Sequence, residues 1–296
     1  MFHIVSGDAF FSGVAMLLAV VCYRWYRRNK TIDSAKMRLL LLIAFLSGVT
    51  GIVFSSTPMP LWLGILLTCI TLAWCGTQWY GATRCLRTHR VIVVLLAVSW
   101  CFAVALEIPW RLLPVTATAP VNAMTVIGDS VSAGMEEGEA ETWPSLLSRQ
   151  HDIEMQDLSH VGETAGSALK RAKKAGILHN YVIAEIGGND ILGSTSPSQF
   201  EIDLEALLSE LRKEDRQVVM FELPLIPLYH RYGMTQRRLA QKYDVALVPK
   251  RYFLSILAEG DATLDSIHLS QSGHQTMSDL VWRLSQRAGK DFPAPN

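Results

Sequence analysis

Residues 39–83 form an unbroken run without a charged side chain, which leaves few folds open to this part of the chain. A helix needs ~20 apolar residues to cross the hydrocarbon layer of a bilayer, so this run is long enough for two spans. Pro58 and Pro60 interrupt its middle, and proline ends helices because it lacks an N–H donor. We therefore expect two membrane-spanning helices, at about 39–55 and 61–79, joined by a tight turn.

Two further apolar runs, 9–23 and 91–106, complete a predicted all-α transmembrane region of four helices over residues 1–112. The spacing of Ser47 and Gly51 in one of these helices favours close packing against a neighbouring helix. None of the four runs contains Asp, Glu, Lys, Arg or His. Since an ionisable group inside a span would indicate function, we expect this region to anchor the protein in the membrane.

Basic residues are distributed unevenly between these runs. The segment after the first run and the segment after the third are basic, whereas the N-terminal flank and the proline turn have no Lys or Arg. Because Lys and Arg favour the cytoplasmic side, we expect a multi-pass protein of the cell membrane. Its N-terminus and everything after Trp110 would lie on the outer side, periplasmic or extracellular. The basic residues are Arg24, Arg27, Arg28, Lys30, Lys36, Arg38, Arg84, Arg87 and Arg90.

The net charge of zero hides two parts of opposite sign. Residues 1–120 carry ten Lys or Arg against three Asp or Glu, and residues 121–296 carry 17 against 24. Nucleic-acid binding needs a basic surface, so the acidic second part excludes that partner. The Pro-, Thr- and Ala-rich stretch 113–121 is interpreted as a linker to a globular domain over 122–296. All five cysteines lie in the first part, and no pair has metal-ligand spacing.

From residue 124 onward, short apolar runs alternate with helix-like stretches. This alternation is typical of a three-layer α/β domain, with helices on both faces of a mainly parallel sheet. In such domains ligands bind at the carboxyl ends of the strands. The expected five strands are 124–127, 153–159, 181–186, 217–223 and 245–248, and the expected helices are 143–150, 165–175, 201–213, 236–243 and 270–288.

Polar segments follow the first three expected strands. Ser130, in Gly-Asp-Ser, offers a hydroxyl that becomes a nucleophile when a base lies beside it, and Asp129 is interpreted as a brace for this turn. Gly162 would let a backbone N–H approach a substrate oxygen closely. Asn189, in Gly-Gly-Asn-Asp, offers an amide that can stabilise an oxyanion. Each segment taken alone is more typical of a turn.

A fourth segment, just before the last expected helix, contains Asp265 and His268. A carboxylate three residues before a histidine can accept from its Nδ1 and direct its Nε2 toward a serine. His274, further along in the expected helix, is interpreted as a structural residue.

Together and in this order, the four segments resemble the SGNH hydrolase family, also called GDSL-type esterases and lipases, over residues 122–288. The resemblance implies a flavodoxin-like fold and a catalytic triad. In that triad Ser130 attacks an ester carbonyl, His268 takes the proton, and Asp265 orients His268. No metal and no organic cofactor is implied.

The resemblance also implies an oxyanion hole. Its donors would be the backbone N–H groups of Ser130 and Gly162 and the side-chain amide of Asn189. The asparagine that the family usually has shortly before this glycine is missing, because Ser159 and His160 stand there. The packing of that loop is therefore left open.

These features predict a membrane-anchored serine esterase that hydrolyses acyl esters, O-acetyl or short-chain, of an envelope or extracellular glycan. Four acidic residues after the nucleophile would disfavour anionic substrates if they line the crevice. They are Glu136, Glu137, Glu139 and Glu141. Two alternatives stay open: a lipid-directed esterase, lysophospholipase or thioesterase, and an O-acyltransferase that works on a glycan with a membrane partner protein.

Overall fold

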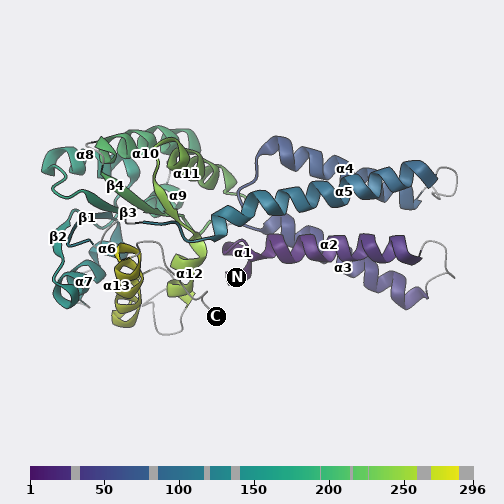
Figure 1. Ribbon diagram of the computed structural model, residues 1–296, viewed down its shortest axis with the longest axis horizontal. Helices are drawn as coiled ribbons and strands as arrows, with labels where there is room; N and C mark the ends of the chain where they lie inside the picture. The colour runs from purple at the N-terminus through teal and green to yellow at the C-terminus, as the bar shows by residue number, and fades with distance from the viewer. Residues whose placement is uncertain are drawn as a thin grey trace. The chain divides into compact units, whose positions relative to one another are not determined.

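The computed structural model forms two compact units, residues 1–111 with 226–230 and residues 112–225 with 231–296. Each unit has its own hydrophobic core, and Figure 1 shows the elements of both. The residues that the structure describes are 1–27, 34–79, 86–116, 121–134, 141–193, 195–213, 216–225, 227–258 and 268–286.

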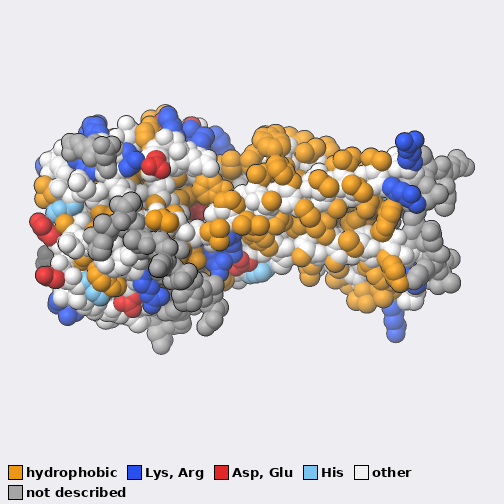
Figure 2. Space-filling view, viewed as in Figure 1, with side chains coloured by type: hydrophobic (Ala, Val, Ile, Leu, Met, Phe, Trp, Pro, Cys, Tyr) orange, Lys and Arg blue, Asp and Glu red, His pale blue; other side chains and the backbone are white. Residues whose placement is uncertain are grey.

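Four long helices make up most of the first unit. Each is long and apolar enough to cross a membrane, which confirms the four helices predicted from the sequence. They are α2 (Asp8–Arg27), α3 (Ala35–Phe54), α4 (Leu61–Trp79) and α5 (Leu86–Glu107). Apolar side chains cover the surface of this unit in Figure 2, and Lys and Arg gather at the end where α2 ends and where α3 and α5 begin.

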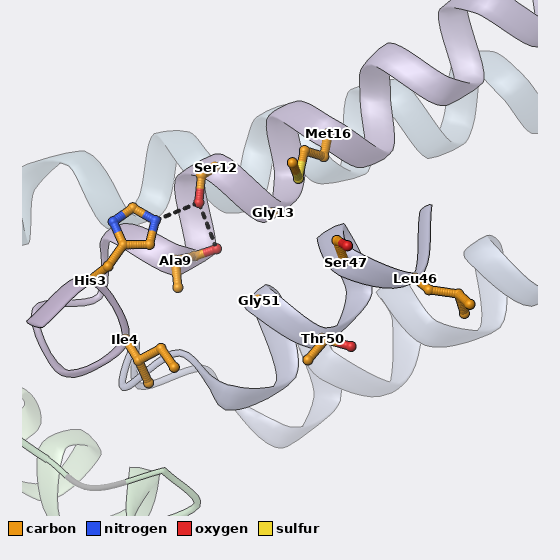
Figure 3. A pocket seen from close by; sticks show the side chains of 10 residues that line it. All are labelled: His3, Ile4, Ala9, Ser12, Gly13, Met16, Leu46, Ser47, Thr50 and Gly51. Atoms are coloured by element: carbon orange, nitrogen blue, oxygen red, sulfur yellow. Dashed lines mark hydrogen bonds between the residues drawn. The ribbon is translucent and has the colours of Figure 1, made fainter. Parts of the chain in front are cut away.

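Helices α2 and α3 approach each other closely at glycines. A Cβ added to Gly13 would lie 2.6 Å from the carbonyl oxygen of Gly48, and one added to Gly48 would lie 2.8 Å from that of Gly13. Gly51 also faces α2, as its spacing predicts. Ser47 instead lines an open groove beside the helix pair, together with His3 (Figure 3). Gly48 thus makes the contact that was predicted for Ser47.

The chain returns after α5 to the end of the bundle where α2 begins. Arg111 ends the short helix η1 (Ile108–Arg111) and forms an ion pair with Asp8. It also donates a hydrogen bond to the carbonyl of Ser6 (2.7 Å), which follows the short helix α1 (Phe2–Val5). An even number of spans requires this return.

The second unit contains a five-stranded sheet of order β2-β1-β3-β4-β5 with every pair parallel. This is the flavodoxin-like order, so the predicted fold class is confirmed. The strands are β1 (Ala123–Gly128), β2 (Glu154–Asp157), β3 (Tyr181–Glu185), β4 (Gln217–Phe221) and β5 (Ala246–Val248).

Helices cover both faces of this sheet (Figure 1). One layer contains α8 (Ala165–Ala175), α10 (Pro197–Leu211) and α11 (His230–Lys242). The other contains α7 (Trp143–His151), α12 (Lys250–Ala258) and α13 (Gln271–Ser285), whose apolar side chains share one core with β1, β3, β4 and β5. Two short helices, α6 (Ser130–Ala133) and α9 (Gly188–Leu192), follow β1 and β3 directly.

Several elements differ from the sequence-based expectation. Helix α12 was not predicted. Helix α11 begins six residues earlier than expected; its first turn is polar and contains Gly233, so the sequence pattern did not indicate a helix there. Part of the predicted linker belongs to the packed unit. Leu113 and Val121 pack against its core, and the buried hydroxyl of Thr116 donates to the carbonyl of Leu284 (2.5 Å).

Candidate active site

The candidate nucleophile lies at the carboxyl end of β1, an interior strand of the sheet that is buried from Met124 onward. Gly128 ends this strand, and a Cβ there would lie 2.3 Å from Ser132 Oγ. Asp129 is the N-cap of α6, and its carboxylate accepts from the N–H of Val131 (3.0 Å). Ser130 therefore begins a helix, where backbone N–H groups have no intrahelical partner.

The loop after β2 is attached to the end of β1. His160 N–H donates to the carbonyl of Gly128 (3.0 Å), and Glu163 N–H donates to the carbonyl of His160 (3.1 Å). Gly162, between them, has φ +76°, and a Cβ added there would meet nothing within 4 Å. Its backbone conformation, rather than crowding, requires glycine. Bonds from His160 and Glu163 thus hold the loop whose packing could not be predicted from the sequence.

Asn189 connects these two segments to a third. It lies in α9, and its Nδ2 donates to Asp129 Oδ2 and to the carbonyl of Glu163, both at 3.2 Å. Both neighbours are acceptors, which fixes the orientation of the amide. Because an amide nitrogen has two hydrogens, Asn189 must weaken one of these long bonds to donate to an oxyanion.

His268 lies just before Ser270, the N-cap of α13. Burial raises the pKa of Asp129, and the electrostatic influence of His268 acts in the opposite direction. The Ser130 hydroxyl makes no hydrogen bond to another described residue, His268 included. Asp265 lies outside the described residues. The relay from Asp265 through His268 to Ser130 stays a prediction.

Two buried carboxyl groups, one from the nucleophile turn and one from β3, lie next to Ser130. Asp129 is 4% exposed, and Glu185, at the end of β3, is 3% exposed. Burial, followed by the neighbouring Asp129 carboxylate, raises the pKa of Glu185 well above its usual range. Glu185 was not predicted as a site residue. The sequence did contain a signal for it, because Glu185 is the one charged residue in the otherwise apolar expected strand 181–186.

His274 has the structural role expected for it. The ring is 3% exposed, and its Nδ1 accepts from the N–H of Trp143 (3.2 Å), which joins α13 to α7. Burial lowers the pKa of His274 to about 4, so the ring is neutral near pH 7. The indole of Trp143 donates in turn to Ser132 Oγ (3.1 Å) in α6.

Most of the acidic stretch after the nucleophile, residues 136, 137 and 139, lies outside the described residues. Glu141 is described, and it forms an ion pair with Arg149 (2.8 Å). Its backbone N–H donates to Gln271 Oε1 (2.9 Å). In the described part of the chain, no group of three His, Cys, Asp or Glu residues is placed to hold a metal ion.

Comparison with known proteins identifies relatives of the second unit. The sequence profile of the GDSL-like lipase/acylhydrolase family matches residues 126–276, just over half of the chain. Esterase TesA of Pseudomonas aeruginosa is 26% identical over 201 residues, which cover 63% of this chain and 95% of that protein. The arylesterase of Vibrio mimicus is 30% identical over 138 residues, 43% of this chain and 69% of that protein.

A third relative is the thioesterase 1/protease 1/lysophospholipase L1 of Escherichia coli K12, which is 28% identical over 140 residues, 44% of this chain and 67% of that protein. Among solved structures, the esterase EstA from Pseudoalteromonas sp. covers 55% of this chain and 95% of its own, with 22% identity and a TM-score of 0.48. TesA covers 55% and 97%, with 25% identity and a TM-score of 0.47.

Proposed function

Because the chain belongs to the GDSL-like lipase/acylhydrolase family, we propose that it is a membrane-anchored serine esterase with Ser130 as its nucleophile. Family membership confirms the resemblance found in the motifs and makes the chain an ester-hydrolysing enzyme. One observation carries the choice of site. The Asn189 amide binds both Asp129, next to Ser130, and the carbonyl of Glu163, next to Gly162. Three motif segments therefore meet at one side chain.

The chemistry follows from this arrangement. Ser130 Oγ attacks the ester carbonyl carbon while His268, oriented by Asp265, takes the hydroxyl proton. The oxyanion accepts hydrogen bonds from the N–H groups of Ser130 and Gly162 and from Asn189. Collapse of this intermediate expels the alcohol, which receives the proton from His268. Water activated by His268 then attacks the acyl-enzyme and releases the acid and the free Ser130 hydroxyl.

The substrate we favour carries an apolar acyl or leaving group. Val161 is 45% exposed and directly precedes Gly162, and Leu192 is 65% exposed and follows Asn189 by one helical turn. Large apolar side chains beside two of the three predicted oxyanion donors favour an apolar group on the ester. Relatives named thioesterase, lysophospholipase and arylesterase support the same choice.

An O-acylated envelope glycan is the second candidate substrate. The distribution of charge in the first unit favours it, because Lys and Arg gather at one end of the bundle and Asp8 and Arg111 lie at the other. If the basic end faces the cytoplasm, the second unit is outside, beside the envelope.

The second unit has no cysteine, so Leu178→Cys, at a 70% exposed position, should be labelled by a membrane-impermeant maleimide in spheroplasts. Labelling only after lysis would refute this orientation.

The nucleophile is tested on the full-length protein in detergent. Wild type should react with an alkyl fluorophosphonate and hydrolyse nitrophenyl esters, and Ser130→Ala should lose both activities. Ser145→Ala, an exposed serine of α7, is the matched control and should keep both. Labelling or turnover retained by Ser130→Ala would refute the proposal.

The same protein distinguishes the substrates. A rate that rises from acetyl to octanoyl esters supports the apolar substrate, and a rate that is highest with acetyl ester supports the glycan. Adding a glycan acceptor tests the acyltransferase alternative, which predicts transfer of the acyl group to the glycan in preference to water.

A further inference from the structure

A carboxyl group that the mechanism does not use lies directly under the nucleophile turn. Glu185 is the last residue of β3, and the register of the parallel pair places it opposite Gly128 at the end of β1. Asp129 N–H donates to the carbonyl of Glu185 (3.2 Å) and lies 3.4 Å from its Oε2. The side chain of Glu185 is thus held beside the residue that precedes Ser130.

Glu185 also binds the residue two positions after Ser130. Ser132 Oγ donates to Glu185 Oε2 (3.0 Å) and accepts from Trp143 Nε1 (3.1 Å). Ser132 is fully buried, so its hydroxyl has no direct contact with solvent in this structure. Glu185 therefore has contacts on both sides of the nucleophile.

The contact with Asp129 extends to the predicted oxyanion hole. Asp129 Oδ2 accepts from Asn189 Nδ2 (3.2 Å), and a Cβ added to Gly188 would lie 3.0 Å from the same oxygen. The Asp129 carboxylate is therefore confined between α6 and α9. A change in its orientation must move the Asn189 amide.

We propose that Glu185 is a positioning residue for ester hydrolysis, because it holds both the turn that carries Ser130 and the Asp129 carboxylate that orients Asn189. The inference rests on the proposed function and adds a residue that never touches the substrate. Two ionised carboxylates so close together would repel each other, so the arrangement needs a proton on one of them.

Burial and the charge of Asp129 raise the pKa of Glu185 well above its usual range, which favours Glu185 as the carrier of this proton. Burial raises the pKa of Asp129, whereas a hydrogen bond between the two carboxyl groups acts to lower it. A neutral carboxylic acid donates one hydrogen bond and accepts others. Glutamine offers the same pattern at nearly the same size, whereas methionine keeps the volume and loses both functions.

The test compares three variants of the full-length protein in detergent, with active sites counted by fluorophosphonate labelling. Glu185→Gln should keep kcat within about threefold of wild type, because the hydrogen bonds persist. Glu185→Met should lower kcat by about tenfold to a hundredfold, because small displacements of catalytic groups have effects of this size. KM should change little in either. Glu185→Asp, which is one methylene too short to reach both partners, should resemble methionine and serves if the methionine variant does not fold.

Glu222→Gln is the matched control. Glu222 directly follows β4, the strand next to β3, is 1% exposed and is paired with Arg237 (2.7 Å). Its replacement therefore disturbs an equally buried carboxyl group that lies outside the nucleophile turn. Its kcat per labelled site should stay at the wild-type value. Normal kcat in Glu185→Met or Glu185→Asp, or equal losses in the glutamine and methionine variants, would overturn the inference. A loss of kcat in Glu222→Gln as large as that in Glu185→Met would also overturn it. Turnover by Ser130→Ala would instead refute the proposed function.

Discussion

Replacing Asn189 by alanine should affect both catalysis and stability, by amounts that the structure allows us to separate. The amide makes two bonds at 3.2 Å, to Asp129 Oδ2 and to the carbonyl of Glu163. A typical hydrogen bond contributes about 1 kcal/mol net, and a buried acceptor left without its donor costs about 1–3 kcal/mol. Since Asp129 is 4% exposed, we expect the free energy of unfolding to fall by roughly 2–4 kcal/mol.

The effect on catalysis should be larger than this destabilisation explains. Loss of one oxyanion donor lowers kcat by ~10²–10³. KM should change by less than about twofold, because the donor acts on charge that develops only in the transition state. Nitrophenyl ester kinetics, normalised to the fluorophosphonate-labelled fraction, give kcat per folded site. Thermal denaturation of the same samples gives the stability.

Asn189→Asp is the matched control for size. It replaces the donor by an acceptor next to Asp129, so kcat should fall at least as far as in Asn189→Ala. An increase in KM with an unchanged kcat would place Asn189 in substrate binding and remove it from the oxyanion hole. Unchanged stability in Asn189→Ala would mean that its two hydrogen bonds contribute nothing in solution, and the link between the three segments would fail.

Three more outcomes are expected. Burial lowers the pKa of His274 from 6.5 to about 4, so between these values the unfolded chain binds a proton that the folded chain does not. Stability should therefore fall by up to about 3 kcal/mol from pH 7 to pH 4; denaturation curves of His274→Asn should show a flatter pH dependence. Gly128→Ala would place a Cβ 2.3 Å from Ser132 Oγ, and the displaced α6 should lower both kcat and stability, the latter by about 1–3 kcal/mol. Gly162→Ala has room for its methyl but adopts φ +76°, so it should cost about 1–2 kcal/mol in thermal denaturation and lower kcat more than it changes KM.

The parts of the fold that depend on local pattern could be predicted from the sequence. Residues 39–83 without charge indicate two spans because a bilayer leaves few alternatives. Helix α8 begins and ends where expected, since Thr164 and Ser167 form a capping box at its start and Gly176 follows its end. The parallel sheet follows from alternating runs, because buried strands need helices on both faces.

Contacts that depend on register could not be predicted in this way. That Gly128 lies opposite Glu185 is a property of the assembled sheet, and only this pairing brings the glutamate under the nucleophile turn. The two bonds of Asn189 depend likewise on three loops meeting at one edge. The sequence could only mark Glu185 as out of place, because a charged side chain is rarely buried without a partner.

The buried pair and the oxyanion hole are linked by competition for the same donor. Asn189 gives both of its hydrogens to Asp129 and Glu163 before a substrate arrives, so its contribution to catalysis is the difference between the oxyanion and the acceptor it leaves. The Asp129 carboxylate also accepts hydrogen bonds from Val131 N–H and from the carboxyl group of Glu185. Because these bonds remain, Asp129 is destabilised less when the Asn189 amide turns to the oxyanion. We therefore expect the effects of Glu185→Met and Asn189→Ala on kcat to be strongly non-additive, because the first change acts through the second residue. If the two factors by which kcat falls multiply in the double variant, the carboxyl pair does not act through the oxyanion hole.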